Sequence, residues 1–229
     1  MLIAIIAAMD EEIKYLNKIL TNKSTETIAN VEFINGTYEE QKVVILKSGI
    51  GKVNAAMATT ILMEKYKPTY VINTGSAGGV SAFLEVGDIV IANEVVHSDV
   101  DVTAFNYDFG QVPQLPPTFK ADTILFDKVK LSLNKLSIPN KIGLVGTADS
   151  FMNNDEKIKE LKKYFPKIVA VEMEGAAIAQ VCYQYDVPYI LIRAISDIAG
   201  EESPITFQKF IDLAAQSIAK VIEQFLSIE

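Results

Sequence analysis

Residues 2–20, LIAIIAAMDEEIKYLNKIL, contain the pattern that decides the fold of this chain. Leu2–Ala8 is wholly apolar, and the absence of polar alternation predicts a strand buried on both faces. The segment Glu11–Leu20 follows directly and has apolar side chains at helical spacing, namely Ile13, Leu16, Ile19 and Leu20. A buried strand joined at once to an amphipathic helix is typical of α/β proteins.

The alternation of strands and helices continues to the end of the chain. A hairpin is predicted for Val31–Tyr38 and Gln41–Lys47, with its turn at Glu39-Glu40. Further strands are predicted at 70–74, 88–94, 141–145, 168–171 and 189–194, and helices at 52–66, 123–136, 155–164, 175–185 and 206–226. No linker interrupts the pattern. We therefore expect one α/β domain over residues 1–229, with a central sheet covered by helices on both faces.

The pattern breaks at Ser98–Lys120, which combines prolines and a glycine with the aromatic side chains Phe105, Tyr107, Phe109 and Phe119. A connection longer than about 15 residues inside a compact domain is usually functional or part of an interface. So many aromatic side chains on one loop favour contact with another surface over full exposure to solvent.

The residue counts restrict the chemistry that is available. The 229 residues carry 21 basic and 29 acidic side chains, which gives a formal net charge of −8. Arg193, His97 and Cys182 are each the only residue of their type. One cysteine excludes an intrachain disulfide and a Cys₄ or Cys₂His₂ zinc site. An acidic chain with one arginine is a poor partner for nucleic acid, so we expect catalysis to depend on carboxylates.

The apolar segment Met1–Met9 raises the question of a signal peptide. It has no basic region before it and runs directly into Asp10-Glu11-Glu12, without a small-residue cleavage site. No apolar run approaches the roughly 20 residues that span a bilayer. We expect a cytoplasmic protein with a reduced thiol and no membrane partner.

Two glycine-rich segments come close to nucleotide-binding motifs without matching them. Gly49–Val53 lacks the P-loop's glycine five positions before the Gly-Lys pair and the Ser or Thr after it. Gly75–Gly79 follows a predicted strand, but Ala77 and Val80 break the G-x-G-x-x-G spacing. Two interpretations of Gly75–Gly79 stay open: a tight strand-to-helix turn, or a close approach of the backbone to a ligand.

The remaining candidates for a metal or a nucleophile are weak. The segment from His97 to Asp101 offers three possible metal ligands at alternating positions, but no second His or Cys lies nearby, so we expect no metal and no cofactor. Cys182 falls in a predicted helix, where a cysteine is usually a buried small hydrophobe. A Cys–His nucleophilic pair would have to use His97 as its base.

Three acidic residues stand where predicted strands end: Glu12, Glu174 and Asp197. Ligands of open α/β sheets bind at the carboxyl ends of the strands, so these side chains could converge on one cleft. Each has a structural alternative, because Glu12 suits the first turn of a helix, Asp197 could cap a turn, and Glu172 or Glu174 could be solvated. The three together favour a site. A carboxylate at Glu174 could accept hydrogen bonds from paired hydroxyls such as those of a ribose.

Several segments form a combination that is specific to one enzyme family: Ala8–Glu12, Lys47–Val53, Asn73–Gly79, Asp99–Phe105, Val171–Glu174 and Arg193–Asp197. With these segments the chain resembles the 5′-methylthioadenosine/S-adenosylhomocysteine nucleosidases of the nucleoside phosphorylase superfamily, nearly from end to end. The resemblance implies a three-layer fold with a central mixed sheet. It also implies hydrolysis of the N-glycosidic bond of 5′-methylthioadenosine, S-adenosylhomocysteine and 5′-deoxyadenosine, in methionine salvage and S-adenosylhomocysteine recycling. The order of preference among these substrates and aminofutalosine stays open.

The resemblance also implies a role for each polar residue. Asp197 would be the general acid that protonates N7 of adenine, which requires a pKa raised by an apolar setting. Glu12 would polarise the attacking water. Glu174 would bind the ribose hydroxyls with help from the Met173 backbone. Arg193 and Ser76 would complete the polar network, and substrate binding would also involve Glu172 and Ser196.

The remaining implied contacts are apolar. Phe151 would stack on adenine, the Met152 backbone would read the edge of the base, and Gly78 would lie close to it. The 5′-thioalkyl pocket would be formed by Met9, Ile50 and Phe207. Val102 and Phe105 would reach that pocket from a partner subunit, which implies a homodimer with loop 98–119 at its interface.

The alternative activity is that of a purine nucleoside phosphorylase. Phosphorylases hold a phosphate dianion, commonly with several arginines, because the guanidinium fork matches phosphate. This chain has one arginine, already assigned to the site, although Lys47 or Lys52 could substitute. Hydrolysis by water is therefore the prediction, and phosphorolysis is the alternative.

Overall fold

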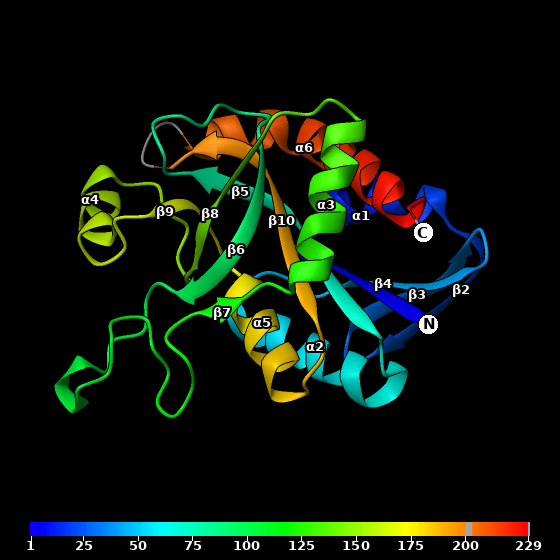
Figure 1. Ribbon diagram of the computed structural model, residues 1–229, viewed down its shortest axis with the longest axis horizontal. Helices are drawn as coiled ribbons and strands as arrows, with labels where there is room; N and C mark the ends of the chain where they lie inside the picture. The colour runs from blue at the N-terminus through cyan, green and yellow to red at the C-terminus, as the bar shows by residue number, and fades with distance from the viewer. Residues whose placement is uncertain (200–202, 229) are drawn as a thin grey trace.

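The computed structural model describes residues 1–199 and 203–228 (Figure 1). The strands are β1 (Leu2–Ala7), β2 (Thr21–Ile28), β3 (Val31–Tyr38), β4 (Gln41–Lys47), β5 (Tyr70–Gly79), β6 (Ile89–His97), β7 (Phe119–Lys120), β8 (Asn140–Thr147), β9 (Ile168–Glu172) and β10 (Tyr189–Ile198). The helices are α1 (Asp10–Ile19), α2 (Lys52–Tyr66), α3 (Thr123–Lys135), α4 (Asp155–Tyr164), α5 (Gly175–Gln184) and α6 (Ser203–Leu226), with a short 3₁₀ helix η1 (Thr103–Phe105). The predicted α/β class is confirmed.

The strands of the described residues form one mixed sheet in the order β10-β6-β8-β9-β5-β1-β4-β3-β2, and β7 pairs with β6. Strand β10 also pairs with β5, in parallel. Because β9 joins β5 to β8, the strands β5, β9, β8, β6 and β10 close into a ring of pairings. This closure gathers the carboxyl ends of β5, β9 and β10 at one place.

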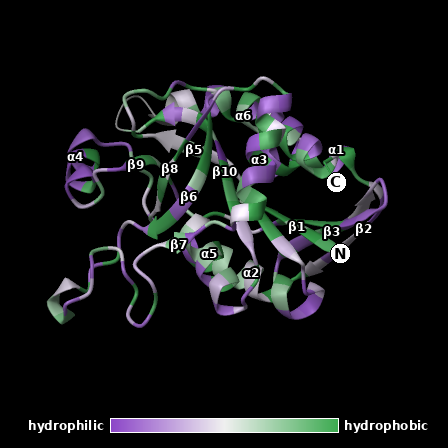
Figure 2. Ribbon diagram, in the orientation of Figure 1, coloured by the Kyte–Doolittle hydropathy of each residue, from purple (hydrophilic) through white to green (hydrophobic). Residues whose placement is uncertain are grey.

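Strand β1 shows how the sheet is buried on both sides. Its residues from Ile3 to Ala7 are fully buried, as the apolar run predicts. Successive side chains of a strand point to opposite faces. Accordingly, Ile3 and Ile5 pack in the core beneath α1, α3 and α6, whereas Ala4 and Ile6 pack in the core beneath α2 and α5. Figure 2 shows the central strands as the hydrophobic part of the molecule.

The hairpin predicted at 31–47 is confirmed as β3 and β4, but the strand before it was not predicted. Strand β2 has the polar sequence TNKSTETI, and nearly all of its residues are exposed. Among the described residues it pairs with β3 alone, at the edge of the sheet. An exposed edge strand has no apolar face to bury, so its sequence lacks the alternation that predicts strands. Charged side chains on such an edge also discourage pairing between molecules.

The interpretation of Gly75–Gly79 as a strand-to-helix turn is wrong. These residues continue β5, which pairs with β10 through Gly75 and Gly79 and with β9 at Gly78 and Gly79. No helix follows in this part of the chain, because the next element is β6. The small residues let neighbouring groups approach closely: a Cβ at Gly75, whose φ is +148°, would lie 2.7 Å from Glu12 Oε1.

The long connection between β6 and α3 extends away from the rest of the molecule (Figure 1). Phe109 anchors its base by stacking on Tyr164 at a centroid distance of 3.9 Å. At its tip η1 presents Phe105, which is 74% exposed. Across the described residues, no helix is long and apolar enough to cross a membrane.

Candidate active site

A cavity of about 350 Å³ opens where β1, β9 and β10 end. Its walls include all three acidic residues that the sequence singled out: Glu12, Glu174 and Asp197. All three are buried, with exposed fractions of 4%, 7% and 2%. The topology therefore brings together carboxylates that are far apart in the sequence.

Most of the other candidate residues line the same cavity, namely Met9, Ile50, Ser76, Gly78, Phe151, Met152, Glu172, Met173, Ser196 and Phe207. Three candidates are not among its lining residues: Arg193, Val102 and Phe105. Sequence reasoning did not assign Ala8, Ala77, Ser150, Val171, Ala199 or Gln208, which also line it. Each of them lies within two positions of an assigned residue in the sequence, and that position is the only signal that could have identified them.

Glu12 is fixed by four hydrogen bonds. It occupies the third position of α1, and its Oε2 accepts from the backbone N–H groups of Ala8 (2.9 Å) and Met9 (3.2 Å) at the start of that helix. Its Oε1 accepts from both the backbone N–H and the hydroxyl of Ser76, each at 2.9 Å. Ser76 is on β5, so the carboxylate is held between α1 and the glycine-rich end of that strand.

Glu174 stands at the N-cap of α5 and faces the start of α2, where the Gly51 N–H donates to its Oε1 at 2.8 Å. The pKa of Glu174 is raised to about 8, most strongly by burial and also by the negative charges of Glu172 and Glu12. The hydrogen bond from Gly51 and the charge of Arg193 lower it. The result is a carboxyl group whose protonation depends on its neighbours.

Asp197 is presented by an irregularity in β10. The pairing register with β5 shifts between Ile195 and Asp197, so that Ser196 is an extra residue on the β10 side. The Ser196 hydroxyl donates to Asp197 Oδ1 at 2.8 Å. The opposite residue is Gly78, where an added Cβ would lie 3.3 Å from Asp197 Oδ2. The bulge and the glycine leave room for a buried carboxyl at the cavity wall.

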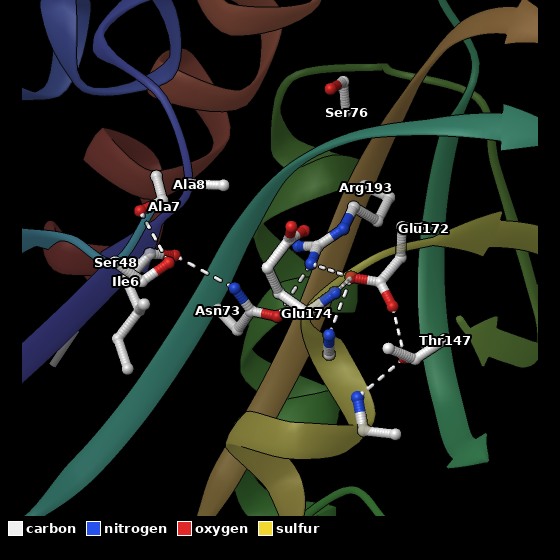
Figure 3. A network of polar contacts seen from close by, with 12 residues as sticks. Ile6, Ala7, Ala8, Ser48, Asn73, Ser76, Thr147, Glu172, Glu174 and Arg193 are labelled. Atoms are coloured by element: carbon white, nitrogen blue, oxygen red, sulfur yellow. Dashed lines mark hydrogen bonds and ion pairs between the residues drawn. The ribbon is translucent and has the colours of Figure 1, made fainter. Parts of the chain in front are cut away.

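Arg193 lies behind the cavity wall and forms a buried ion pair with Glu172, at 2.6 Å between Nη2 and Oε2 (Figure 3). Both side chains are 2% exposed. The same Nη2 donates to Asn73 Oδ1 at 2.8 Å. The guanidinium is thus held between β5 and β9, next to Glu174.

Aromatic residues stand at one side of the cavity. The rings of Phe151 and Phe207 pack edge to face with their centroids 6.2 Å apart, although they come from segments more than fifty residues apart. Phe151 is 40% exposed and Ile50 is 49% exposed, so parts of this apolar wall remain uncovered. Val102 and Phe105, on the extended loop, do not reach the cavity of their own chain.

The other polar candidates have partners of their own. His97 Nε2 lies 2.9 Å from Gln180 Oε1, and Lys52 Nζ pairs with Asp99 at 2.6 Å. Burial lowers the pKa of His97 and raises that of Cys182. In the part of the chain that the structure describes, no group of three or more His, Cys, Asp or Glu side chains could hold a metal ion.

Comparison with known proteins identifies the fold and its relatives. A family model described as the phosphorylase superfamily matches residues 2–227. The 5′-methylthioadenosine/S-adenosylhomocysteine nucleosidase of Bacillus cereus (strain G9842) is 52% identical over 229 residues, which cover 98% of this chain and 99% of that protein.

Two solved structures are similar over nearly the whole chain. The nucleosidase of the same name from Neisseria meningitidis, in complex with methylthio-immucillin-A, is 42% identical with a TM-score of 0.96 and covers 98% of both chains. That from Colwellia psychrerythraea 34H, in complex with adenine, is 44% identical with a TM-score of 0.96 and covers 99% of this chain and 94% of that one. The chain belongs to the 5′-methylthioadenosine/S-adenosylhomocysteine nucleosidase family of the phosphorylase superfamily.

Proposed function

We propose that the chain hydrolyses the N-glycosidic bond of 5′-methylthioadenosine and S-adenosylhomocysteine, releasing adenine and the thioribose. The observation that carries this proposal is the meeting of Glu12, Glu174 and Asp197 in one buried cavity. Cleavage of such a bond passes through an oxocarbenium-like transition state, with positive charge on the sugar and negative charge on the leaving base. Carboxylates stabilise the positive charge on the sugar, and a carboxylic acid can protonate the leaving base.

Each carboxyl group suits one of these tasks. Asp197 protonates N7 of adenine from its buried position beside Gly78 at the cavity wall. Glu12, held by four donors, polarises the attacking water together with Ser76. Glu174 accepts hydrogen bonds from the ribose 2′- and 3′-hydroxyls.

The remaining lining residues divide between the two ends of the substrate. Phe151 stacks on adenine, the Met152 backbone reads its edge, and Gly78 leaves room for the base. Met9, Ile50 and Phe207 enclose the 5′-thioalkyl group, while Met173, Glu172 and Ser196 stay near the ribose and the acid. The exposed Ile50 and the distant Phe105 support a homodimer in which Val102 and Phe105 of the partner subunit complete this pocket. We place the enzyme in the cytoplasm, in methionine salvage and S-adenosylhomocysteine recycling.

Ion pairing of the basic side chains favours hydrolysis over phosphorolysis. Arg193 is paired with Glu172, Lys52 with Asp99, and Lys47 with Asp10 at 2.7 Å. Each of these three cations is therefore already next to a carboxylate, which repels phosphate.

The test is adenine release from 5′-methylthioadenosine in phosphate-free buffer. We expect full activity that does not change when phosphate is added, with the free thioribose as the product. Activity that stalls without phosphate and recovers on its addition, with the sugar 1-phosphate as the product, would assign the chain to the phosphorylases instead.

A further inference from the structure

Glu172 lines the cavity, and groups of the protein hold both oxygens of its carboxylate. Its Oε2 accepts from Arg193 Nη2 at 2.6 Å, from the Glu174 N–H at 3.1 Å and from the Gly175 N–H at 2.7 Å. Its Oε1 accepts from the hydroxyl of Thr147. Three of these donors converge on Oε2 and the fourth meets Oε1. Both oxygens of the carboxylate are therefore held by groups of the protein itself.

Thr147 holds the other side of this carboxylate. It is fully buried at the end of β8, and its hydroxyl donates to Glu172 while accepting from the Ala176 N–H at 2.7 Å (Figure 3). One hydroxyl thus joins Glu172 to the first turn of α5. That turn begins directly after Glu174 at the N-cap, so its position sets where the Glu174 carboxyl points.

Asn73 holds Arg193 from the opposite direction. Its Oδ1 accepts from Arg193 Nη2 at 2.8 Å, and its Nδ2 donates to the Ile6 carbonyl at 3.1 Å. The residue is 2% exposed in the middle of the sheet. The chain Ile6–Asn73–Arg193–Glu172–Thr147 crosses five strands and ends on α5, and Figure 3 shows its members in one continuous network.

We infer that Thr147, Glu172 and Asn73 are positioning residues, which act through Arg193 and the start of α5 to hold Glu174 in place for the sugar. This inference rests on the proposed function and gives Glu172 a positioning role in place of a direct contact with substrate. Removing one member leaves a buried charge or a buried N–H without its partner. Because the hydrogen bonds of a buried network strengthen one another, the loss also weakens the neighbouring bonds.

Electrostatics gives the inference a signature that a purely structural role lacks. The charged groups that act on Glu174 are Glu172, Arg193 and Glu12, and the Gly51 N–H donates to it. The charge of Glu172 raises the pKa of Glu174, and that of Arg193 lowers it. In Glu172→Gln the repulsion is gone and Arg193 is no longer neutralised, so both changes make Glu174 easier to ionise.

The first experiment compares Thr147→Val with Thr147→Ser, using kcat/KM for 5′-methylthioadenosine in phosphate-free buffer. Valine keeps the shape and removes the hydroxyl, and we expect kcat/KM to fall about tenfold or more while the fold is retained. Serine keeps the hydroxyl, and we expect kcat/KM of Thr147→Ser to stay within about threefold of the wild-type value. An unchanged kcat/KM in Thr147→Val overturns the inference.

The second experiment records the pH dependence of kcat/KM for Glu172→Gln, which reports ionisations of the free enzyme. Glu174 acts as an ionised acceptor, so a lower pKa moves the acid limb of the profile to lower pH than in the wild type. An acid limb that stays at the wild-type pH overturns the inference. A wild-type chain that releases no adenine contradicts the proposed function itself, whereas an active wild type with unaltered variants contradicts only the positioning roles.

Discussion

At the scale of single residues, Glu174 couples folding to pH. Its ordinary pKa is 4.5, and burial raises the value to about 8 in the folded chain. A carboxyl whose pKa is higher in the folded state stabilises that state below pH 4.5, and this contribution is lost as the pH rises through 8. We therefore expect the melting temperature of the wild type to fall between pH 5 and pH 8 more steeply than that of Glu174→Gln, which cannot ionise.

Thermal melts of the ligand-free protein across that range provide the measurement. Glu160→Gln is a matched control, because it removes an exposed carboxylate from α4 and should follow the wild-type curve. Identical pH dependence in the wild type and Glu174→Gln would mean that Glu174 does not titrate in this range.

The residues of the site differ in how far the sequence could reveal them. Glu12, Glu174 and Asp197 were predicted to converge because they stand at strand ends, and the cavity contains all three. Asn73 carried a weaker signal, since it is a polar amide inside the apolar strand YVINT. Thr147 carried no signal in the sequence, because threonine is an ordinary strand residue and its partner Glu172 is 25 positions away. Partners that meet only through the fold leave no local pattern.

At the scale of elements, the glycine-rich end of β5 is where strand and site meet. Gly75 and Gly87 both have positive φ, of +148° and +98°, so alanine at either position strains the backbone at a cost of about 1 kcal/mol. A Cβ at Gly75 would lie 2.7 Å from Glu12 Oε1, whereas at Gly87 nothing lies within 4 Å.

We expect Gly75→Ala to lower stability more than Gly87→Ala, because its Cβ also clashes with Glu12, and we expect only Gly75→Ala to impair catalysis. Gly75→Ala should lower kcat at least about tenfold, because it displaces the Glu12 carboxylate from the water it polarises. Gly87→Ala should keep the wild-type kcat. Melting temperatures and initial rates of adenine release measure both effects, and equal kcat losses in the two variants would contradict the role of this contact.

The elements that were predicted poorly share a physical cause. Strand β2 has no buried face, and the end of β5 has residues too small to show an apolar pattern. Strand β10 was predicted to stop at Ala194 but continues to Ile198, because its polar residues Ser196 and Asp197 are buried at the site. Apolar periodicity finds strands that bury hydrophobic side chains, and it fails where burial serves an active site or is absent.

At the scale of the whole molecule, the pairing of β10 with both β5 and β6 decides where the site forms. Such a closure depends on contacts between strands about a hundred or more residues apart, so periodicity within the sequence could not predict it. The broken pattern at 98–120 predicts a functional or interface segment, and that role stays a prediction. Its extension away from the sheet places Phe105 outside its own cavity, with 74% of its surface exposed.

The homodimer that we propose makes a prediction about mixed subunits. Phe105→Ala should raise KM for 5′-methylthioadenosine by removing apolar contact with the thioalkyl group, and Asp197→Asn should abolish turnover by removing the proton donor. In a mixed dimer, the site built on the Phe105→Ala chain keeps its own Asp197 and receives the intact Phe105 of the Asp197→Asn chain. Co-refolding the two variants should therefore restore activity at low substrate concentration, above the sum of the separate variants. Co-refolding Asp197→Asn with itself is the control, and light scattering checks that dimers form. No gain on mixing would show that Phe105 does not serve the partner's site.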